Sequence, residues 1–286
     1  MKRLIGVGVG PGDPELITVK AIRVLRSADL VLVPVLGRPG EEDQAETGRA
    51  EATVRAHVDG AAIRRVAFAL NDAGGVTPAR AAAWDAAADA VTGAFAAGSG
   101  TVAFATLGDP ALYSTFSYLA QSVTARDPGV TVGTVPGITA LQDLAARSGT
   151  VLAEGTESLV LLPLTAGPGA LAEALAAHDT VVAYKLSAAG PLETVREALA
   201  EAGRLDGAVF GARVGLPDED IRPVKEVPAG EPVPYLAALI STGRRSGRGS
   251  RLDGPGTAGE AAAGPADRAT GPGLAGRAGE SRGGST

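Results

Sequence analysis

The tripeptide Gly-Asp-Pro occurs twice in the sequence, each time after a short apolar run and before a stretch with helical spacing. The first copy is Gly12-Asp13-Pro14 in IGVGVGPGDPELIT, and the second is Gly108-Asp109-Pro110 in ATLGDPALYSTF. An aspartate at a helix entrance accepts hydrogen bonds from free N–H groups and interacts favourably with the positive end of the helix dipole. Because such a turn repels a second anion, the two copies favour a ligand that carries hydroxyls or a positive charge.

Two common phosphate-binding motifs do not fit these turns. The dinucleotide fingerprint needs glycine at its first, third and sixth positions, but the sixth residue is Pro11 counted from Gly6 and Asp13 counted from Gly8. A Walker A loop needs Gly-Lys-Ser/Thr, and the lysines nearby are Lys2 and Lys20. The alternative for either copy alone is a plain strand–turn–helix junction with aspartate as its N-cap.

The glycines of GVGVGPG remove side chains at four places. We expect them to let the backbone bend sharply and to let a flat, bulky ligand approach. Gly108 does the same in the second copy, and a third turn, Val-Pro-Gly-Ile-Thr, follows at 135–139.

Composition narrows the class of protein. The formal net charge of −6 over 286 residues argues against a nucleic-acid binder. Without cysteine, and with two histidines far apart, the sequence predicts no disulfide and no metal site. The N-terminal MKRLIGVGVG lacks a signal-peptide pattern, and we find no uninterrupted apolar run of membrane-spanning length. We therefore expect a cytoplasmic protein.

Strand-like and helix-like segments alternate over residues 1–242, which is typical of a parallel, doubly wound α/β sheet. Strands are predicted at 3–10, 29–35, 63–70, 101–106, 130–137, 158–165, 180–187, 207–214 and 235–241. Helices are predicted at 15–28, 77–98, 110–126, 138–149, 168–177 and 191–203, and 37–60 is predicted to be a loop followed by a surface helix. Either Asp13 or Thr18 would cap the first helix. In such sheets ligands bind beyond the carboxyl ends of the strands, where the three glycine turns lie.

The chain divides into three parts on this pattern. An N-terminal α/β domain is predicted at 1–152 and a C-terminal α/β domain at 153–242. Residues 243–286 are rich in Gly, Ala, Arg, Ser and Pro without hydrophobic periodicity, so we expect a disordered tail.

The segments GVGPGDPELITVKAIRVLRSADLVLVP, LGDPALYSTFSYL and VPGITA, in this order and spacing, resemble the tetrapyrrole methylase family. The resemblance covers roughly residues 1–242 and implies a cofactor cleft between two α/β domains. It also implies S-adenosylmethionine as methyl donor, a small-molecule tetrapyrrole substrate, and a homodimer without nucleic-acid or membrane partners. The Tyr-Ser-Thr-Phe run and the Trp84 helix are most similar to members that methylate C20 of precorrin-2 to give precorrin-3A in cobalamin biosynthesis.

The resemblance also implies site residues. Those expected to contact the cofactor are Pro11, Gly108, Asp109, Leu112, Thr139, Ala140, Tyr184, Lys185, Ala212 and Gly215. Those expected to face the substrate are Gly10, Gly12, Tyr113, Ser114 and Thr115. Pro34 stands where uroporphyrinogen methylases carry an aspartate, which disfavours that substrate, and PYLAALI at 234–240 departs from the family's PYFSLLL.

The expected chemistry needs positioning more than acid–base groups. A sulfonium donor is already activated and the C20 carbon is enamine-like, so holding the two in line can lower the barrier by roughly 7–11 kcal/mol. Asp13 is the candidate for assisting proton loss from C20, with helix capping as its other role. Because the chain is acidic, the substrate carboxylates require local basic residues, for which Lys20, Arg38, Arg64, Arg65 and Arg80 are candidates.

Alternatives remain open on the sequence. A cobalt-containing substrate of the anaerobic pathway, or another precorrin, would suit the same motifs. A nucleotide-binding oxidoreductase is the remote alternative, and the broken dinucleotide fingerprint speaks against it.

Overall fold

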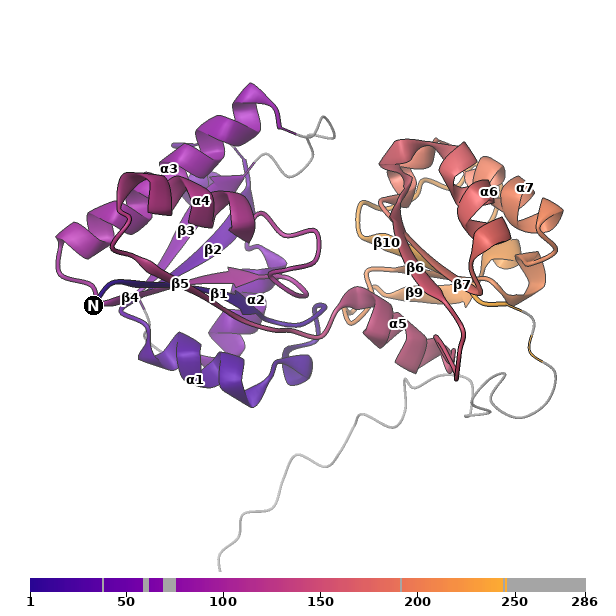
Figure 1. Cartoon of the computed structure of the whole chain (residues 1–286), viewed down its shortest axis with the longest axis horizontal. Coiled ribbons are helices and arrows are strands. Elements are labelled where there is room, and N and C mark those ends of the chain that lie inside the picture. The colour runs from indigo at the N-terminus through magenta and orange to yellow at the C-terminus, as the bar shows by residue number, and fades with distance from the viewer. Residues whose placement is uncertain (38, 59–61, 69–75, 191, 244, 246–286) are drawn as a thin grey trace, which may run out of the picture.

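The computed structural model describes residues 1–37, 39–58, 62–68, 76–190, 192–243 and 245. The predicted disordered tail at 243–286 therefore lies almost wholly outside the described residues. Two five-stranded sheets form the framework, and each is covered by helices on both faces (Figure 1). We call the part built on the first sheet the N-terminal lobe and the part built on the second sheet the C-terminal lobe.

The first sheet is entirely parallel, as the sequence predicts. Its strands are β1 (Arg3–Gly8), β2 (Leu30–Leu36), β3 (Ile63–Phe68), β4 (Thr101–Thr106) and β5 (Thr131–Val135). They lie in the order β3-β2-β4-β1-β5, so β1 pairs with both β4 and β5. The carboxyl ends of these three strands therefore meet at one edge, which confirms the expected position of the glycine turns.

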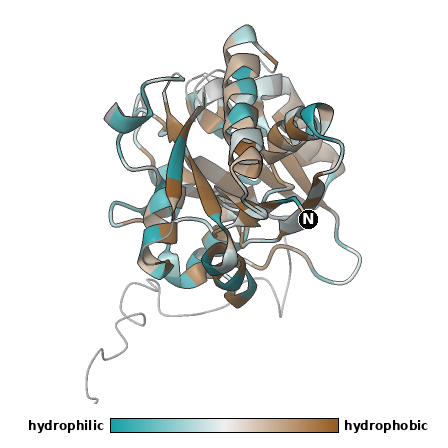
Figure 2. Ribbon diagram, turned by 90° about the vertical axis from the view of Figure 1, so that its left-hand side faces the viewer, coloured by the Kyte–Doolittle hydropathy of each residue, from teal (hydrophilic) through white to brown (hydrophobic). Residues whose placement is uncertain are grey.

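Four helices cover the first sheet. Helices α1 (Val19–Ser27) and α2 (Arg49–His57) pack on one face, and α3 (Pro78–Ala96) and α4 (Phe116–Arg126) pack on the other. Figure 2 shows hydrophobic residues along the strands and hydrophilic ones concentrated on the outer helices and loops. Both predicted caps are used, because Asp13 caps the short 3₁₀ helix η1 (Pro14–Leu16) and Thr18 caps α1.

Two helix predictions for this lobe are wrong in detail. Helix α4 begins at Phe116 and not at 110, because Tyr113 adopts a left-handed backbone conformation that an α-helix cannot contain. Helix α2 is not a plain surface helix, since the Glu51 side chain is fully buried. Its carboxylate forms ion pairs with Arg55, 2.8 Å away, and with Arg65 of β3, 2.9 Å away.

The second sheet is mixed. Its strands are β6 (Leu159–Pro163), β7 (Thr180–Tyr184), β8 (Val209–Ala212), β9 (Asp220–Pro223) and β10 (Ala237–Ser241). They lie in the order β6-β7-β10-β8-β9, and only β6 and β7 are paired in parallel. Strand β9 was not predicted, because its four residues Asp-Ile-Arg-Pro contain no apolar run.

Three helices cover the second sheet. Helices α6 (Pro168–Ala177) and α7 (Leu192–Glu201) pack on one face, and α5 (Ala140–Ser148) packs on the other with Leu141 and Leu144. Helix α5 thus belongs to the C-terminal lobe, although it precedes the boundary predicted between 152 and 153, which stays a prediction. Among the described helices, none is long and apolar enough to cross a membrane.

Candidate functional site

The three glycine turns meet backbone to backbone at the edge of the first sheet. A Cβ atom added to Gly8 would lie 2.5 Å from the Gly108 carbonyl oxygen and 2.6 Å from the Gly137 nitrogen. A Cβ on Gly6 would lie 2.6 Å from the Phe116 ring. The expectation that these glycines make room for a flat ligand is therefore wrong for Gly6 and Gly8, because other parts of the protein fill that room.

The second Gly-Asp-Pro turn has a different surrounding. Gly108 adopts φ +69°, and a Cβ on it would meet only the Thr139 Cα, 3.9 Å away. Its backbone is therefore left bare on the side that faces the C-terminal lobe. Asp109 fixes the turn, because its carboxylate accepts hydrogen bonds from Ala111 N at 2.7 Å and from Gly137 N at 3.0 Å.

A cavity of about 190 Å³ lies between the two lobes next to this turn. Its N-terminal-lobe side begins at Pro11 and runs through the loop at 107–113. Its other side is formed by the start of α5 and by the ends of β7, β8 and β10. The lining residues are Pro11, Leu107, Gly108, Asp109, Leu112, Tyr113, Thr139, Ala140, Tyr184, Lys185, Gly211, Arg213, Val214, Tyr235, Leu236, Ala237 and Ala238.

The structure brings most of the expected cofactor residues together in this cavity. Pro11, Gly108, Asp109, Leu112, Thr139, Ala140, Tyr184 and Lys185 all line it, as does Tyr113 from the expected substrate set. Ala212 is buried among core residues under α6 and α7, while its neighbours Gly211 and Arg213 reach the cavity. Alternation of side chains along a strand explains this difference.

Gly215 from the expected cofactor set, and the expected substrate residues other than Tyr113, are not among the residues that line the cavity. Gly10 pairs with Gly108 through a backbone bridge, and Gly12 approaches Leu216 of the C-terminal lobe. Ser114 lies 3.0 Å from the Thr106 hydroxyl, and Thr115 is the N-cap residue of α4. Their expected roles stay predictions.

Three non-glycine residues among those described have a left-handed backbone, and all three line the cavity. They are Tyr113 with φ +51°, Lys185 with φ +57° and Arg213 with φ +52°. L-residues adopt this conformation at an energetic cost, which the surrounding structure must offset, and such residues concentrate at binding sites. The strain therefore marks this cavity as the candidate functional site.

Aromatic and charged side chains meet across the cavity. The Tyr113 ring of the N-terminal lobe packs edge-on against Tyr184 of the C-terminal lobe, with ring centroids 5.7 Å apart. The Lys185 ammonium also lies 5.7 Å from the Tyr113 ring centroid. The Tyr184 hydroxyl accepts a hydrogen bond from Leu141 N at 3.1 Å, which satisfies a free N–H group at the start of α5. Burial raises the pKa of Tyr184 to about 12, so this phenol is neutral at physiological pH.

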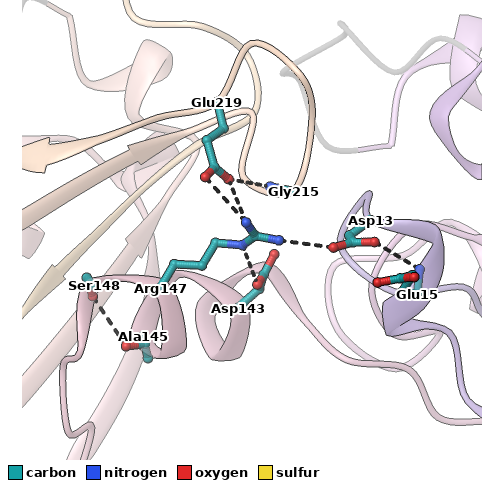
Figure 3. Close-up of polar contacts among 8 residues, drawn as sticks. All are labelled: Asp13, Glu15, Asp143, Ala145, Arg147, Ser148, Gly215 and Glu219. Atoms are coloured by element: carbon teal, nitrogen blue, oxygen red, sulfur yellow. Dashed lines mark hydrogen bonds and ion pairs between the residues drawn. The ribbon is translucent and has the colours of Figure 1, made fainter. Parts of the chain in front are cut away.

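Asp13, the candidate base, takes part in a polar cluster outside the cavity lining (Figure 3). One carboxylate oxygen accepts a hydrogen bond from Glu15 N at 2.9 Å, and the other forms an ion pair with Arg147 of α5 at 3.2 Å. Arg147 also pairs with Asp143 at 2.8 Å and with Glu219 at 3.3 Å. Both Asp13 oxygens are thus engaged, one in capping η1 and one in joining the lobes.

Of the candidate basic residues, two have partners within the N-terminal lobe. Arg65 pairs with the buried Glu51, and the Arg80 guanidinium lies 5.7 Å from the Trp84 ring centroid. Arg38 lies outside the described residues. Arg213 and Tyr235 line the cavity and were not predicted, although Arg213 follows the expected cofactor residue Ala212 and Tyr235 lies in the PYLAALI segment.

Comparisons with known proteins place this geometry in a family. The chain is 32% identical over 240 residues to a cobalt-precorrin-2 C(20)-methyltransferase of Salmonella typhimurium, covering 83% of this chain and 95% of the relative. It is 34% identical over 243 residues to a precorrin-2 C(20)-methyltransferase of Sinorhizobium sp, covering 84% of this chain and 95% of the relative.

A solved structure shares the fold. The uroporphyrin-III C-methyltransferase of Thermus thermophilus, complexed with S-adenosylhomocysteine, matches with a TM-score of 0.53 at 21% identity. The match covers 84% of this chain and 97% of that one. The family model described as Tetrapyrrole (Corrin/Porphyrin) Methylases matches residues 3–228, from β1 to beyond β9. The chain therefore belongs to the tetrapyrrole methylase family, as its two-lobed fold and its glycine turns indicate.

Proposed function

We propose that this protein transfers a methyl group from S-adenosylmethionine to C20 of precorrin-2 and so forms precorrin-3A. The family uses S-adenosylmethionine as its methyl donor. The C20 position is supported by the two relatives named for it, each similar over more than four fifths of this chain. The observation that carries the proposal is the interlobe cavity, in which the Gly108 turn and all three left-handed non-glycine residues of the described chain meet.

The cavity suits this cofactor. Its lining is mainly apolar with a few polar side chains, as is usual for sites that bind organic molecules. The bare backbone of Gly108 and the Leu112 side chain would hold the cofactor from the N-terminal-lobe side, and Thr139 and Ala140 at the start of α5 would hold it from the other side. When bound, S-adenosylmethionine supplies a methyl group on a positively charged sulfur.

The residues of the chain position the reactants and exclude water. Tyr184 is held by its hydrogen bond to Leu141 N, and Tyr113 packs against it from the opposite lobe, so the aromatic wall is fixed before a ligand arrives. Placement of this kind can supply roughly 7–11 kcal/mol of barrier lowering in favourable cases. A general-base role for Asp13 stays a prediction, and its contacts with Glu15 N and Arg147 favour a structural role.

A labelling experiment tests the function. The protein is incubated anaerobically with S-adenosylmethionine labelled in its methyl group and with precorrin-2, and the product is identified by mass spectrometry and NMR. We expect one labelled methyl group at C20. Label at another carbon, or none in the tetrapyrrole, would refute the proposal.

The metal content of the substrate defines a second candidate. The relative from Salmonella typhimurium is named for the cobalt-containing substrate, and its identity to this chain is close to that of the other relative. Comparing kcat/KM for metal-free and cobalt-containing precorrin-2 in the same assay distinguishes the two. The homodimer implied by the resemblance stays a prediction, which light scattering would test.

A further inference from the structure

Lys185 places a positive charge in the interlobe cavity. It follows directly after β7, and its left-handed backbone, with φ +57°, directs the chain away from the strand. Its ammonium lies over the Tyr113 ring of the opposite lobe, 5.7 Å from the centroid. The neighbouring Tyr184, bonded to Leu141 N, fixes the start of this turn.

The other charged residues of the cavity lining already have partners. Arg213 forms an ion pair with Asp218 at 2.6 Å and donates to the Asp218 carbonyl oxygen. Asp109 accepts two backbone hydrogen bonds. Within the part of the chain that the structure describes, Lys185 has the Tyr113 ring and no acidic partner. Among the charged residues that line the cavity, Lys185 is therefore the one that forms no hydrogen bond or ion pair with another described residue.

A ligand that fills the cavity removes water from this ammonium. Stripping water from an unpaired charge is costly unless the ligand brings an acceptor, and a carboxylate is the strongest common one. The proposed reactants carry this group in two places. S-adenosylmethionine has an α-carboxylate on its methionine part, and precorrin-2 has carboxylate side chains.

We propose that Lys185 is a carboxylate-binding residue of this site, and this inference rests on the proposed function. The carboxylate comes from the methyl donor or from the tetrapyrrole. In both cases the Lys185 ammonium donates a charge-assisted hydrogen bond to it. In either case the residue selects for an acidic ligand at the C-terminal-lobe side of the cavity.

The test uses two substitutions of Lys185, and both keep a non-glycine residue in its left-handed backbone conformation, so the energetic cost of that conformation does not change. Lys185→Met removes the charge and keeps an unbranched chain over Tyr113, whereas Lys185→Arg keeps the charge. Lys225→Met, at an exposed position of η6 (Val224–Glu226) outside the cavity lining, is the matched control for the loss of one positive charge. Calorimetry gives the Kd of S-adenosylhomocysteine and of 5′-methylthioadenosine, which lacks the amino-acid part. Steady-state kinetics gives KM and kcat for precorrin-2.

If Lys185 donates a charge-assisted hydrogen bond to a carboxylate, Lys185→Met should raise the Kd or the KM of the ligand that carries this carboxylate about 10- to 100-fold. Lys185→Arg should restore most of the lost affinity. If the Kd of S-adenosylhomocysteine rises and that of 5′-methylthioadenosine does not, the carboxylate is the donor's. If the KM for precorrin-2 rises and the Kd of S-adenosylhomocysteine does not, it is the substrate's.

The inference is overturned if the wild-type protein is active and Lys185→Met behaves like Lys225→Met in both assays. It is also overturned if Lys185→Arg loses as much affinity as Lys185→Met, because the positive charge would then not be what binds the ligand. Failure of the proposed function looks different, since the wild-type protein itself would then bind no S-adenosylhomocysteine or leave precorrin-2 unchanged.

Discussion

Replacing Arg147 with methionine tests the polar cluster that joins the two lobes (Figure 3). The Asp143 side chain is only 4% exposed, and Arg147, at 2.8 Å, is the ion-pair partner of one of its oxygens. Its other oxygen is buried without a hydrogen-bond partner in the described structure. Without Arg147 the carboxylate would therefore be buried and unpaired, which typically costs about 3–5 kcal/mol. Asp13 and Glu219 are 28% and 30% exposed, so their lost pairs add little.

The pH dependence follows from the pKa of Asp143. Burial raises this pKa above its ordinary value, and the pairing with Arg147 opposes the rise. Because the folded-state pKa is raised, the folded protein takes up a proton more readily than the unfolded chain, and stability from this group falls as pH rises through that pKa. Removing Arg147 raises the pKa further.

Protonation of Asp143 limits the cost of Arg147→Met at low pH. Neutralising the carboxyl costs about 1.4 kcal/mol per pH unit above its ordinary pKa of about 3.9. At pH 5 the free energy of unfolding lost on Arg147→Met is therefore at most ~1.5 kcal/mol, whereas at pH 8 the full loss of ~3–5 kcal/mol applies.

Thermal unfolding at pH 8 and pH 5 measures this difference. A loss of ~3 kcal/mol corresponds to a fall in Tm of roughly 6–12 °C for a chain of this size. Arg126→Met is the matched control, because Arg126 pairs with the exposed Asp85 and Asp89 and should cost less than about 1 kcal/mol. Adding Asp143→Asn to Arg147→Met removes the unpaired charge and should therefore restore most of the stability lost at pH 8. The reasoning is refuted if Arg147→Met costs no more than Arg126→Met, or costs the same at both pH values.

Three further predictions test other parts of the structure. Gly137→Ala should destabilise the fold by about 1–3 kcal/mol or more and weaken S-adenosylhomocysteine binding, because a Cβ there meets backbone. Gly133→Ala on β5, with nothing within 4 Å, should change neither, and equal effects of the two would contradict the steric argument. Tyr184→Phe should lower the free energy of unfolding by about 0.5–1.5 kcal/mol. The difference between the absorbance titrations of the unchanged protein and of Tyr184→Phe should show Tyr184 ionising near its pKa of about 12, and a difference signal near 10 would refute its burial. Burial raises the pKa of Glu51, but hydrogen bonds from Arg65 and Arg55 outweigh this and lower it. Its stabilising effect should therefore be present above its ordinary pKa and fall away as pH falls through the lowered one, so Glu51→Gln should lose stability in denaturant at pH 7 and much less in acid; a loss independent of pH would contradict this.

Much of the N-terminal lobe could be predicted from the sequence. All five parallel strands of the first sheet were predicted. The apolar runs of β1, β2 and β4 reflect burial of these inner strands on both faces, whereas the edge strands β3 and β5 include polar or exposed residues and were predicted from shorter runs. The Gly108 turn and the Val-Pro-Gly turn were predicted to lie at the same edge of the sheet, since the carboxyl ends of parallel strands share one edge. These inferences depend on local patterns and on one topological rule.

Other features depend on contacts between distant segments, which no local pattern encodes. Tyr113 lies within a stretch of helical spacing, but the loop at 107–115 gives it a left-handed backbone, and it contacts Tyr184 and Lys185 in the other lobe. The sequence predicts an exposed Glu51, but in the folded chain this residue is buried and forms an ion pair with Arg65 of β3.

The sequence by itself determined the α/β class, the strands of the first sheet and the two Gly-Asp-Pro turns, of which the one at 108–110 borders the cavity. The tertiary structure alone decided what the two aspartates of those turns do. Asp109 ties two turns of one lobe together, and Asp13 pairs with Arg147, 134 positions away in the chain. Identical tripeptides thus serve different purposes, because the partner of a carboxylate is set by how the lobes pack and not by its neighbours in sequence.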